Sequence, residues 1–377
     1  MKIDYITPLP ASDVSQWSGL NYYIAKSLEI SDIEVNYIDS YIPKQPKYTI
    51  KQIYYKIRGL RYKPDRNKTF VRNYNKRIEL MLSSDADIIF APSSLSVAFL
   101  ESKKPKVFYT DATFASMIDY YEGFDNLCNE SSDDGNQIEQ LALNSCSMAI
   151  YSSEWAANSA RDFYGTSMSK LEVVPFGANI DSYLSEDQVI NIINGRPKDH
   201  CNLLLLGVDW KRKGGDMALS VTKRLNELGL KTTLRIVGID DLPEYANMPF
   251  VKSYGFVNKN SNEGRILINE LIQESHFLIV PSTAEAFGVV FCEASSFGVP
   301  SLATKTGGIP SAVTHGLNGY LFDLESTSEE YANYVLSLFG NYPDYVNLSM
   351  SSFKHFQRTL NWKTAGDNLR RLLERLV

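Results

Sequence analysis

The chain has 377 residues, of which 44% are hydrophobic and 22% are charged, and its formal net charge at pH 7 is −6. This length predicts about two domains, each with a sizeable core. No apolar run approaches the ~18 residues of a membrane-spanning helix. The four cysteines lie far apart without a CxxC pair, and the four histidines have no ligand spacing. We therefore expect neither a disulfide framework nor a structural metal, and we expect a cytoplasmic location.

The first half of the chain alternates predicted strands with helical stretches. The N-terminal MKIDYITPLP has Asp4 inside its first apolar run, which is typical of a strand and not of a signal peptide. A Pro/Ser/Gly loop and a predicted helix over 20–29 follow. Further strands are predicted at 86–94, 106–113, 148–155 and 171–177. Strands that alternate with helices indicate a mostly parallel, doubly wound sheet.

The alternation weakens around 180–200 and then restarts, so we place a domain boundary there. Strands are predicted in the second half at 202–207, 232–238, 276–281 and 300–306. Helices are predicted at 215–229 and, more briefly, at 286–298. The tail after 364 has the pattern of an amphipathic helix. The sequence thus predicts two α/β sheets in tandem.

Two glutamates lie in the apolar stretch AEAFGVVFCEASSFGVP, residues 284–300. The stretch follows a strand, and ligands bind open α/β sheets outside the carboxyl ends of their strands. Glu285 and Glu293 are eight positions apart, which on a helix is about 12 Å and ~80° of rotation, so both can face one groove. Taken alone, Glu285 also fits an acid favoured near a helix N-terminus. Glu293 needs either a buried Arg or Lys or the hydroxyls of a ligand, because an unpaired carboxylate among apolar side chains costs several kcal/mol.

The residues between the two acids suit an anion. Phe287, Gly288 and Val289 lie at the predicted start of the helix, where glycine lets backbone N–H groups approach a ligand and the helix favours negative charge. The expected ligand therefore carries an anionic group in its middle and hydroxyls at both ends. A nucleoside diphosphate sugar has this order.

Other strand-to-helix junctions also suit phosphate. Gly207 follows the first strand of the second half, and Arg212 and Lys213 precede the next helix. A solvated basic loop is the alternative interpretation, and the spacing is neither a Walker A motif nor GxGxxG. Two more junctions of this kind contain Gly307-Gly308 and Ser18-Gly19.

This combination resembles the retaining GT-B glycosyltransferases of family 4. Residues 285–293 fit the E-x7-E signature of that family. The other matching landmarks are Arg212-Lys213-Gly214, Pro281-Ser282, Gly307-Gly308-Ile309-Pro310, Gly316-Leu317-Asn318-Gly319 and 174–179. The similarity is strong over 200–322 and is mainly one of layout in the first half.

The resemblance implies an α/β fold of GT-B type, with two Rossmann-like doubly wound domains facing across a cleft. Residues 1–180 would bind the acceptor, and 181–350 would bind the nucleotide sugar. Residues 351–377 would form a C-terminal helix that packs back on the first domain.

The resemblance also implies roles for the site residues. Glu293 would hold the ribose hydroxyls, and Glu285 the hydroxyls of the donor sugar, beside the amides of Phe287 and Gly288. Arg212 and Lys213 would neutralise the leaving diphosphate. The remaining implied donor contacts are Val289, Gly207, Gly308, Ser18 and Gly19. The family usually has an arginine directly after the glycine of this strand, where this chain has Val208-Asp209, and Arg212 is the residue that would compensate.

The implied reaction is the transfer of a hexosyl group, with retention, from a UDP- or GDP-sugar to an acceptor hydroxyl. UDP is slightly preferred because it is common in the family. The leaving phosphate would take the acceptor's proton, so neither a protein base nor a cofactor nor a metal is required. A glycan, a lipid-linked acceptor or a protein could accept the sugar, in the synthesis of cell-surface glycan, polysaccharide or glycolipid.

Two aspartate motifs in the first half are weaker signals. Asp111 follows a strand and either touches the donor sugar or the acceptor, or caps the next helix. Asp85-Ala-Asp87 fits the DxD pattern of metal-dependent glycosyltransferases, but it lies before a strand and not after one. We therefore interpret it as a solvated loop.

Positive charge is concentrated in 44–77. This segment has one acid, Asp65, and a charge of +11, so that the rest of the chain carries −17. Its twelve cations are Lys44, Lys47, Lys51, Lys56, Arg58, Arg61, Lys63, Arg66, Lys68, Arg72, Lys76 and Arg77.

Apolar residues recur at helical spacing within the basic segment. The two sets are Ile50, Ile53, Tyr54 and Ile57, and Phe70, Tyr74, Ile78 and Met81. Three interpretations remain open: solvated helices packed on the first domain, docking to the inner face of an anionic membrane, or binding of an anionic soluble acceptor or nucleic acid. Nucleic acid is the least expected, because no nucleic-acid module accompanies the tyrosines.

Two rival functions follow from the same residues. One is a catalytically silent protein that binds a sugar nucleotide or an anionic polymer, although the joint presence of Glu285, Glu293, Arg212 and Lys213 argues against it. The other is a Rossmann oxidoreductase, which the missing GxGxxG disfavours.

Overall fold

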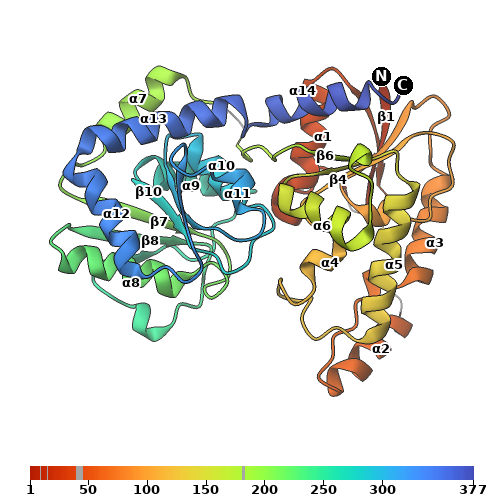
Figure 1. The fold of residues 1–377 in the computed structure, drawn as a ribbon, viewed down its shortest axis with the longest axis horizontal. Coiled ribbons are helices and arrows are strands. Elements are labelled where there is room, and N and C mark those ends of the chain that lie inside the picture. The colour runs from red at the N-terminus through yellow and green to blue at the C-terminus, as the bar shows by residue number, and fades with distance from the viewer. Residues whose placement is uncertain (9, 15, 40–45, 181–182) are drawn as a thin grey trace. The chain divides into compact units, whose positions relative to one another are not determined.

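The computed structural model describes residues 1–8, 10–14, 16–39, 46–180 and 183–377. The chain divides into two compact units, Met1–Pro175 with Trp362–Val377 and Phe176–Asn361, each built on a six-stranded parallel sheet (Figure 1). The sequence-based limits of the second domain are 181 and 350, and residues 181–182 and Lys44 lie outside the described residues.

The first unit has the strand order β2-β1-β3-β4-β5-β6. Its strands are β1 (Lys2–Thr7), β2 (Glu34–Asp39), β3 (Ile88–Ala91), β4 (Lys106–Thr110), β5 (Met148–Tyr151) and β6 (Leu171–Val173). Its helices are α1 (Leu20–Ile30), α2 (Pro46–Ile57), α3 (Lys68–Glu79), α4 (Phe114–Met117), α5 (Asn129–Ser145), α6 (Glu154–Tyr164) and α14 (Trp362–Leu373). Every residue of β3 and β5 is buried, as expected for parallel strands covered on both faces.

The second unit has the strand order β12-β11-β10-β7-β8-β9. Its strands are β7 (Cys201–Leu206), β8 (Thr232–Val237), β9 (Val251–Ser253), β10 (Phe277–Val280), β11 (Ser301–Thr304) and β12 (Gly319–Phe322). Its helices are α7 (Glu186–Gly195), α8 (Gly215–Glu227), α9 (Asn262–Gln273), α10 (Val289–Ser295), α11 (Ile309–Ala312), α12 (Ser328–Gly340) and α13 (Tyr342–Arg358).

Both strand orders contain a reversal that positions ligands in this kind of sheet. In the second unit the chain runs from β7 outward to β9 and then returns to the other side of β7 with β10. The carboxyl ends of β7 and β10 are therefore neighbours whose following loops diverge, which is the usual position of a ligand crevice. In the first unit the same reversal lies between β1 and β3.

The predicted strands are confirmed, and the strands that sequence reasoning missed are all at sheet edges. These are β2, β9 and β12. Half of the residues of β2 are exposed, and β9 has only three residues, so neither shows the continuous apolar run of a central strand. Within the described part of the chain, none of the helices combines the length and apolar character of a membrane span.

The tail helix α14 packs against α1 within the first unit (Figure 1). Trp362 is buried, and its ring stacks on that of Tyr23 with 6.2 Å between centroids. Ser31 Oγ donates a hydrogen bond of 3.0 Å to Asp367 Oδ1. Gly366 lets the two helices approach, because a Cβ there would lie 2.1 Å from the carbonyl oxygen of Ser27.

We expect Gly366→Ala to lower the free energy of unfolding by about 1–3 kcal/mol, the usual cost of overpacking, as measured by chemical denaturation. Gly340→Ala is the matched control, since no atom lies within 4 Å of a Cβ at that helical position. The control should change stability by less than about 0.5 kcal/mol. Equal losses in the two variants would contradict the close contact between α1 and α14.

The second unit has a buried histidine at the start of β10. His276 Nδ1 accepts a hydrogen bond of 3.0 Å from the backbone N–H of Asn202, and Nε2 lies 2.8 Å from the carbonyl oxygen of Pro197. Burial, and then the charge of Arg196, lower the pKa of His276 to about 3. The imidazole is therefore neutral in the folded protein at neutral pH.

Stability should fall as the pH falls from about 6.5 towards 3. In this window the unfolded chain binds a proton at position 276 that the folded protein does not, so the free energy of unfolding decreases by up to about 1.4 kcal/mol per pH unit. His276→Asn keeps an acceptor but cannot titrate, so we expect lower stability at pH 7 and a shallower pH slope. If the free energy of unfolding changes with pH at the same slope in the wild type and in His276→Asn, the acid sensitivity belongs to other groups.

Candidate functional site

A buried ion pair joins the two loops that flank the strand reversal of the second unit. Lys213 comes from the loop after β7, and its ammonium group bonds Oε2 of Glu285, which comes from the loop after β10. Nη1 of Arg212 lies 3.3 Å from the same carboxylate oxygen. Lys213 and Glu285 are 7% and 6% exposed. Three predicted site residues therefore meet at one point.

Two glycines make room for this pair. A Cβ on Gly207, directly after β7, would lie 2.7 Å from Cγ of Lys213, so the lysine side chain passes over a position that only glycine leaves free. Gly214 precedes α8 with a φ of +74°, and a Cβ there would lie 2.2 Å from the carbonyl oxygen of Pro281. The glycines thus bring the start of α8 against the end of β10.

Arg212 is oriented by an acid of its own loop. Asp209 Oδ1 accepts a hydrogen bond of 3.0 Å from the backbone N–H of Arg212, and Oδ2 lies 3.6 Å from its Nε. Asp209 is part of the Val208-Asp209 pair that departs from the family pattern. The aspartate therefore positions the arginine that was expected to compensate for this departure.

Glu293 lies on α10 and is 2% exposed. Both of its carboxylate oxygens accept hydrogen bonds from Nζ of Lys259, at 2.8 and 2.7 Å. A lysine thus pairs Glu293, although it is not the buried cation that the sequence analysis considered. The Lys259 side chain is 43% exposed, so it can leave the carboxylate without uncovering an apolar core.

The loop between the two acids is fixed by several contacts. Gly288 has a φ of +88° and precedes α10, whose first amide, at Val289, has no intrahelical acceptor. Phe287 is buried edge-on against Phe176, with 5.2 Å between centroids. The N–H of Gly308 donates a hydrogen bond of 3.0 Å to the carbonyl oxygen of Glu285. The amide-rich turn is therefore preorganised next to the ion pair.

The first unit holds the remaining predicted site residues. Ser18 and Gly19 follow Trp17 in a run of left-handed backbone, with φ of 46°, 55° and 83° for the three residues, directly before α1. Two non-glycine residues in this region cost about 1–3 kcal/mol each, which is typical of a functional loop.

The two aspartate motifs have defined surroundings. Asp111 follows β4, but the cap of α4 is Thr113, whose side chain accepts from the N–H of Ser116 at 3.1 Å. The alternative role of Asp111 as a helix cap is therefore wrong. Asp85 and Asp87 precede β3 and bond the ammonium group and the backbone N–H of Lys2, both at 2.8 Å. No cluster of potential metal ligands is found among the described residues.

The arrangement in the second unit is suited to a ligand with anionic and hydroxyl groups. An ammonium group has three donors, and the one acceptor of Lys213 within the described part of the chain is Glu285. Asp209 and Glu285 balance the charges of Arg212 and Lys213, but both cations carry N–H donors that a phosphate can accept, while a carboxylate accepts hydrogen bonds from hydroxyls.

Sequence reasoning missed Lys259 and a nearby cavity. Lys259 lies in a polar loop after the edge strand β9, and its hydrogen bonds to Glu293 show that this loop reaches α10 although β7 and β8 separate β9 from β10. The cavity has a volume of about 380 Å³ and is lined by residues that include Gly214, Thr283 and Asp323. It lies at the carboxyl ends of the strands, where no single motif marks it.

Residues 200–341 match the family model described as "Glycosyl transferases group 1". This part of the chain is therefore similar to the group 1 glycosyl transferases. It contains both acids, the two loop cations and Lys259. A relative from Klebsiella pneumoniae, described as an "Uncharacterized 41.2 kDa protein in cps region", is 26% identical over 259 residues, which cover 68% of each chain.

Solved structures share the fold over the whole length. The lipopolysaccharide outer core galactosyltransferase WaaB, in its apo form, has a TM-score of 0.67 at 13% identity, with 100% of each chain covered. HepE from Anabaena, in complex with UDP, has a TM-score of 0.67 at 17% identity, again with 100% of each chain covered. The expected GT-B fold is confirmed by these matches and by the two parallel sheets.

We expect Gly207→Ala to push the Lys213 side chain away from Glu285 and to lower the free energy of unfolding by about 1–3 kcal/mol. Gly195→Ala, at a position with no atom within 4 Å of the new Cβ, is the control. In a double-mutant cycle the cost of Gly207→Ala should vanish in the background of Lys213→Ala. If Gly207→Ala still lowers the free energy of unfolding in the Lys213→Ala background, the new methyl group clashes with an atom other than those of the Lys213 side chain.

Proposed function

We propose that this protein is a retaining hexosyltransferase that moves a sugar from a nucleoside diphosphate sugar to an acceptor hydroxyl in the synthesis of a cell-surface glycan or glycolipid. The observation that carries the proposal is the meeting of Lys213, Arg212 and Glu285 at the strand reversal of the part of the chain that is similar to the group 1 glycosyl transferases. UDP is the favoured nucleotide, because the structurally similar HepE was solved with UDP and with UDP-glucose.

The proposed roles follow from charge. Lys213 and Arg212 bind the diphosphate and stabilise the negative charge that grows on it as the bond to the anomeric carbon breaks. Glu285, freed in part from these cations by the phosphate, accepts hydrogen bonds from the sugar hydroxyls. Glu293 binds the ribose hydroxyls once Lys259 moves aside.

The bond changes balance without a further reactant. The bond between the anomeric carbon and the phosphate oxygen breaks, and the acceptor oxygen bonds the same carbon from the same face. The acceptor's proton passes to the leaving phosphate. This route gives no role to a protein base, a metal or a cofactor, and Asp111, Ser18 and Gly19 are proposed to contact donor or acceptor.

The glycan context has two supports. The Klebsiella relative is described by its place in a cps region, and WaaB is a galactosyltransferase of the lipopolysaccharide outer core. A catalytically silent protein that binds a sugar nucleotide or an anionic polymer is the second candidate, because Lys213 and Lys259 already pair with the two acids that would otherwise bind donor hydroxyls.

Binding and turnover should separate in two variants. We expect Glu293→Gln to weaken the binding of UDP-sugar by about 10- to 100-fold, the effect of losing hydrogen bonds to a charged group. Lys213→Met should lower kcat by about 100- to 1000-fold with a smaller effect on affinity. Calorimetry with UDP- and GDP-sugars, and release of nucleotide in the presence of an acceptor, measure the two effects.

The control is Lys223→Met, which removes an exposed lysine from α8 that is 64% accessible. It should leave both quantities unchanged. Tight binding of a nucleotide sugar without transfer to any acceptor hydroxyl would favour the silent binding protein. Wild-type kinetics in both site variants would reject the assigned roles.

A double variant distinguishes a ligand site from a merely structural pair. Lys213→Met alone leaves the Glu285 carboxylate partly unpaired, so it should also be destabilising. Lys213→Met with Glu285→Gln removes both charges and should recover stability. If the pair has only a structural role, the double variant will also recover nucleotide binding, whereas a ligand site stays impaired.

A further inference from the structure

Helix α2 of the first unit exposes an apolar face. Its apolar stripe, defined as Ile50, Ile53, Tyr54 and Ile57, has the i, i+3, i+4, i+7 spacing of one helix face. These side chains are 68%, 56%, 49% and 80% exposed, whereas an apolar stripe on a helix of this kind normally faces the core. The stripe is therefore available to an external partner.

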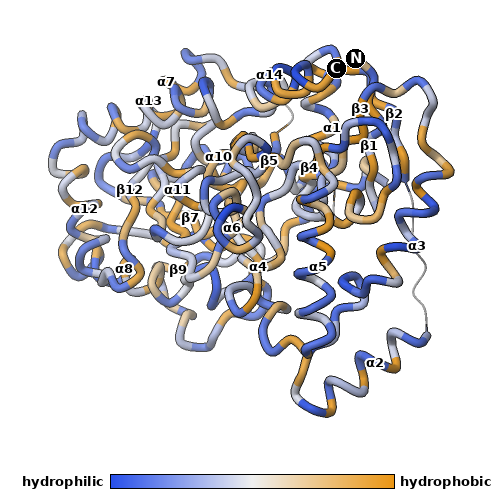
Figure 2. The backbone as a smooth tube through the Cα atoms, turned by 45° about the vertical axis from the view of Figure 1, so that its right-hand side comes forward, coloured by the Kyte–Doolittle hydropathy of each residue, from blue (hydrophilic) through white to orange (hydrophobic). Residues whose placement is uncertain are grey.

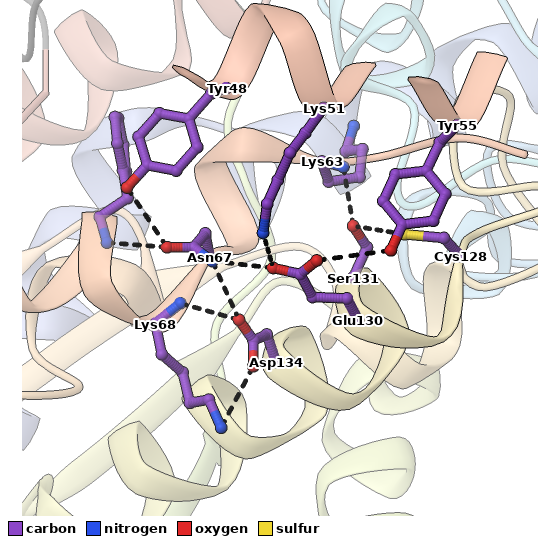
Figure 3. A network of polar contacts seen from close by, with 11 residues as sticks. Tyr48, Lys51, Tyr55, Lys63, Asn67, Lys68, Cys128, Glu130, Ser131 and Asp134 are labelled. Atoms are coloured by element: carbon purple, nitrogen blue, oxygen red, sulfur yellow. Dashed lines mark hydrogen bonds and ion pairs between the residues drawn. The ribbon is translucent and has the colours of Figure 1, made fainter. Parts of the chain in front are cut away.

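The opposite face of α2 is tied to the rest of the unit by polar contacts (Figure 3). Lys51 and Tyr55 both bond the carboxylate of Glu130 on α5, and the hydroxyl of Tyr48 donates to Asn67 at 3.3 Å. These three α2 positions and the stripe lie on roughly opposite sides at 100° per residue. The network thus fixes α2 with its apolar stripe turned outward.

The apolar stripe of α2 is exposed, whereas the similar apolar pattern on α3 is buried in part. Tyr74 and Ile78 of α3 are buried against the core of the first unit. The interpretation of solvated helices packed on the domain is thus confirmed for α3, while for α2 it does not account for the stripe. Figure 2 shows α2 at the periphery of the unit, with apolar and polar residues alternating along it.

Cations border the stripe on both sides. Lys47 and Arg58 lie on one flank and Lys56 on the other, at 100° per residue. None of these three has an acid within ion-pair distance among the described residues, and α2 itself has no Asp or Glu.

A cavity of about 550 Å³ continues this surface beyond the end of α2. Its lining includes Lys56, Leu60, Arg61, Lys63 and Asn126. Burial lowers the pKa of Lys63, whose Nζ lies 4.2 Å from the centroid of the Phe124 ring. The cavity thus adds cationic side chains next to the apolar stripe.

We propose that α2 is a membrane-docking helix whose apolar stripe inserts into the surface of an anionic phospholipid bilayer while its flanking cations contact the phosphate headgroups. An exposed apolar face bordered by Lys and Arg is the pattern of a helix that lies in the membrane interface. Anionic lipid adds about 1 kcal/mol per cation, roughly a fivefold gain in affinity each. The docked helix would keep the first unit at the surface that carries lipid-linked acceptors.

Two other occupants fit the surface less well. A second copy would bring the same cations against each other across a two-fold axis, and four side chains offer much less than the ~800 Å² per partner of a stable interface. Nucleic acid would need exposed rings for stacking, but the guanidinium of Arg58 already covers the Tyr54 ring at 3.6 Å from its centroid.

The test is flotation of the full-length protein with vesicles, without donor or acceptor, so that its result is independent of the proposed sugar transfer. Vesicles of phosphatidylglycerol and phosphatidylcholine in equal parts are compared with pure phosphatidylcholine, at low and at high salt. We expect binding to the anionic vesicles, weaker binding at high salt, and little binding to the neutral ones.

Two variant pairs separate the contributions. Ile53→Ser with Ile57→Ser should weaken vesicle binding at least tenfold, and Leu80→Ser with Phe163→Ser, at positions 89% and 62% exposed elsewhere on the unit, should leave it unchanged. Lys56→Gln with Arg58→Gln should weaken it about 25-fold, from two losses of about fivefold each. Lys76→Gln with Arg77→Gln, on exposed positions of α3, removes the same charge and should have a smaller effect.

Insertion itself can be read from a single reporter. The chain has four tryptophans of its own, so the emission of Ile57→Trp is compared with that of the wild type. Only the variant should show a blue shift and strong quenching by brominated lipid when anionic vesicles are added. Absence of wild-type binding to anionic vesicles would overturn the proposal. Equal vesicle binding by the Ile53→Ser, Ile57→Ser variant would also overturn it. The same holds if the wild type forms a dimer in sedimentation, or a complex with single-stranded RNA, and this variant does not.

Discussion

The buried ion pair between Lys213 and Glu285 is the interaction on which the candidate site depends. Removing one partner of such a pair is costly, yet replacing both by apolar side chains is often neutral or stabilising, so the pair has little value for folding alone. The chain nevertheless keeps glycine at 207 and 214, where a Cβ would clash with Lys213 or with Pro281. A backbone shaped around two buried charges is better explained by the chemistry of a ligand than by stability.

The sheet order explains why these charges meet. Lys213 and Glu285 are 72 positions apart, but the return of the chain from β9 to β10 places their loops side by side. The central strands, the helix that carries Glu293, and the loop cations Arg212 and Lys213 were all predictable. Continuous apolar runs and glycines leave local signals in the sequence. Lys259 was not predictable, because its contact with Glu293 depends on the position of an edge strand that has only three residues.

Helices α2 and α3 mark another limit of sequence reasoning. Both carry apolar residues at helical spacing between lysines and arginines, and periodicity identifies such a face without identifying what it contacts. The difference comes from α5, whose Glu130 bonds the polar side of α2 and so leaves Ile53 and Ile57 outside. Tyr74 of α3 instead enters the core. The interpretation of one pattern therefore required a contact more than 70 residues away in sequence.

The uneven charge of the chain is distributed between its two compact units. The basic segment belongs entirely to the first unit, whereas in the second unit Lys213 is paired with Glu285 and Lys259 with Glu293. A paired cation attracts other anions less strongly, because the carboxylate beside it offsets part of its charge. Unpaired cations such as Lys56 attract any anionic surface over a Debye length of about 8 Å at physiological salt. Lys56 and the pair of Lys213 with Glu285 thus belong to different compact units, so a substitution in one set leaves the contacts of the other in place.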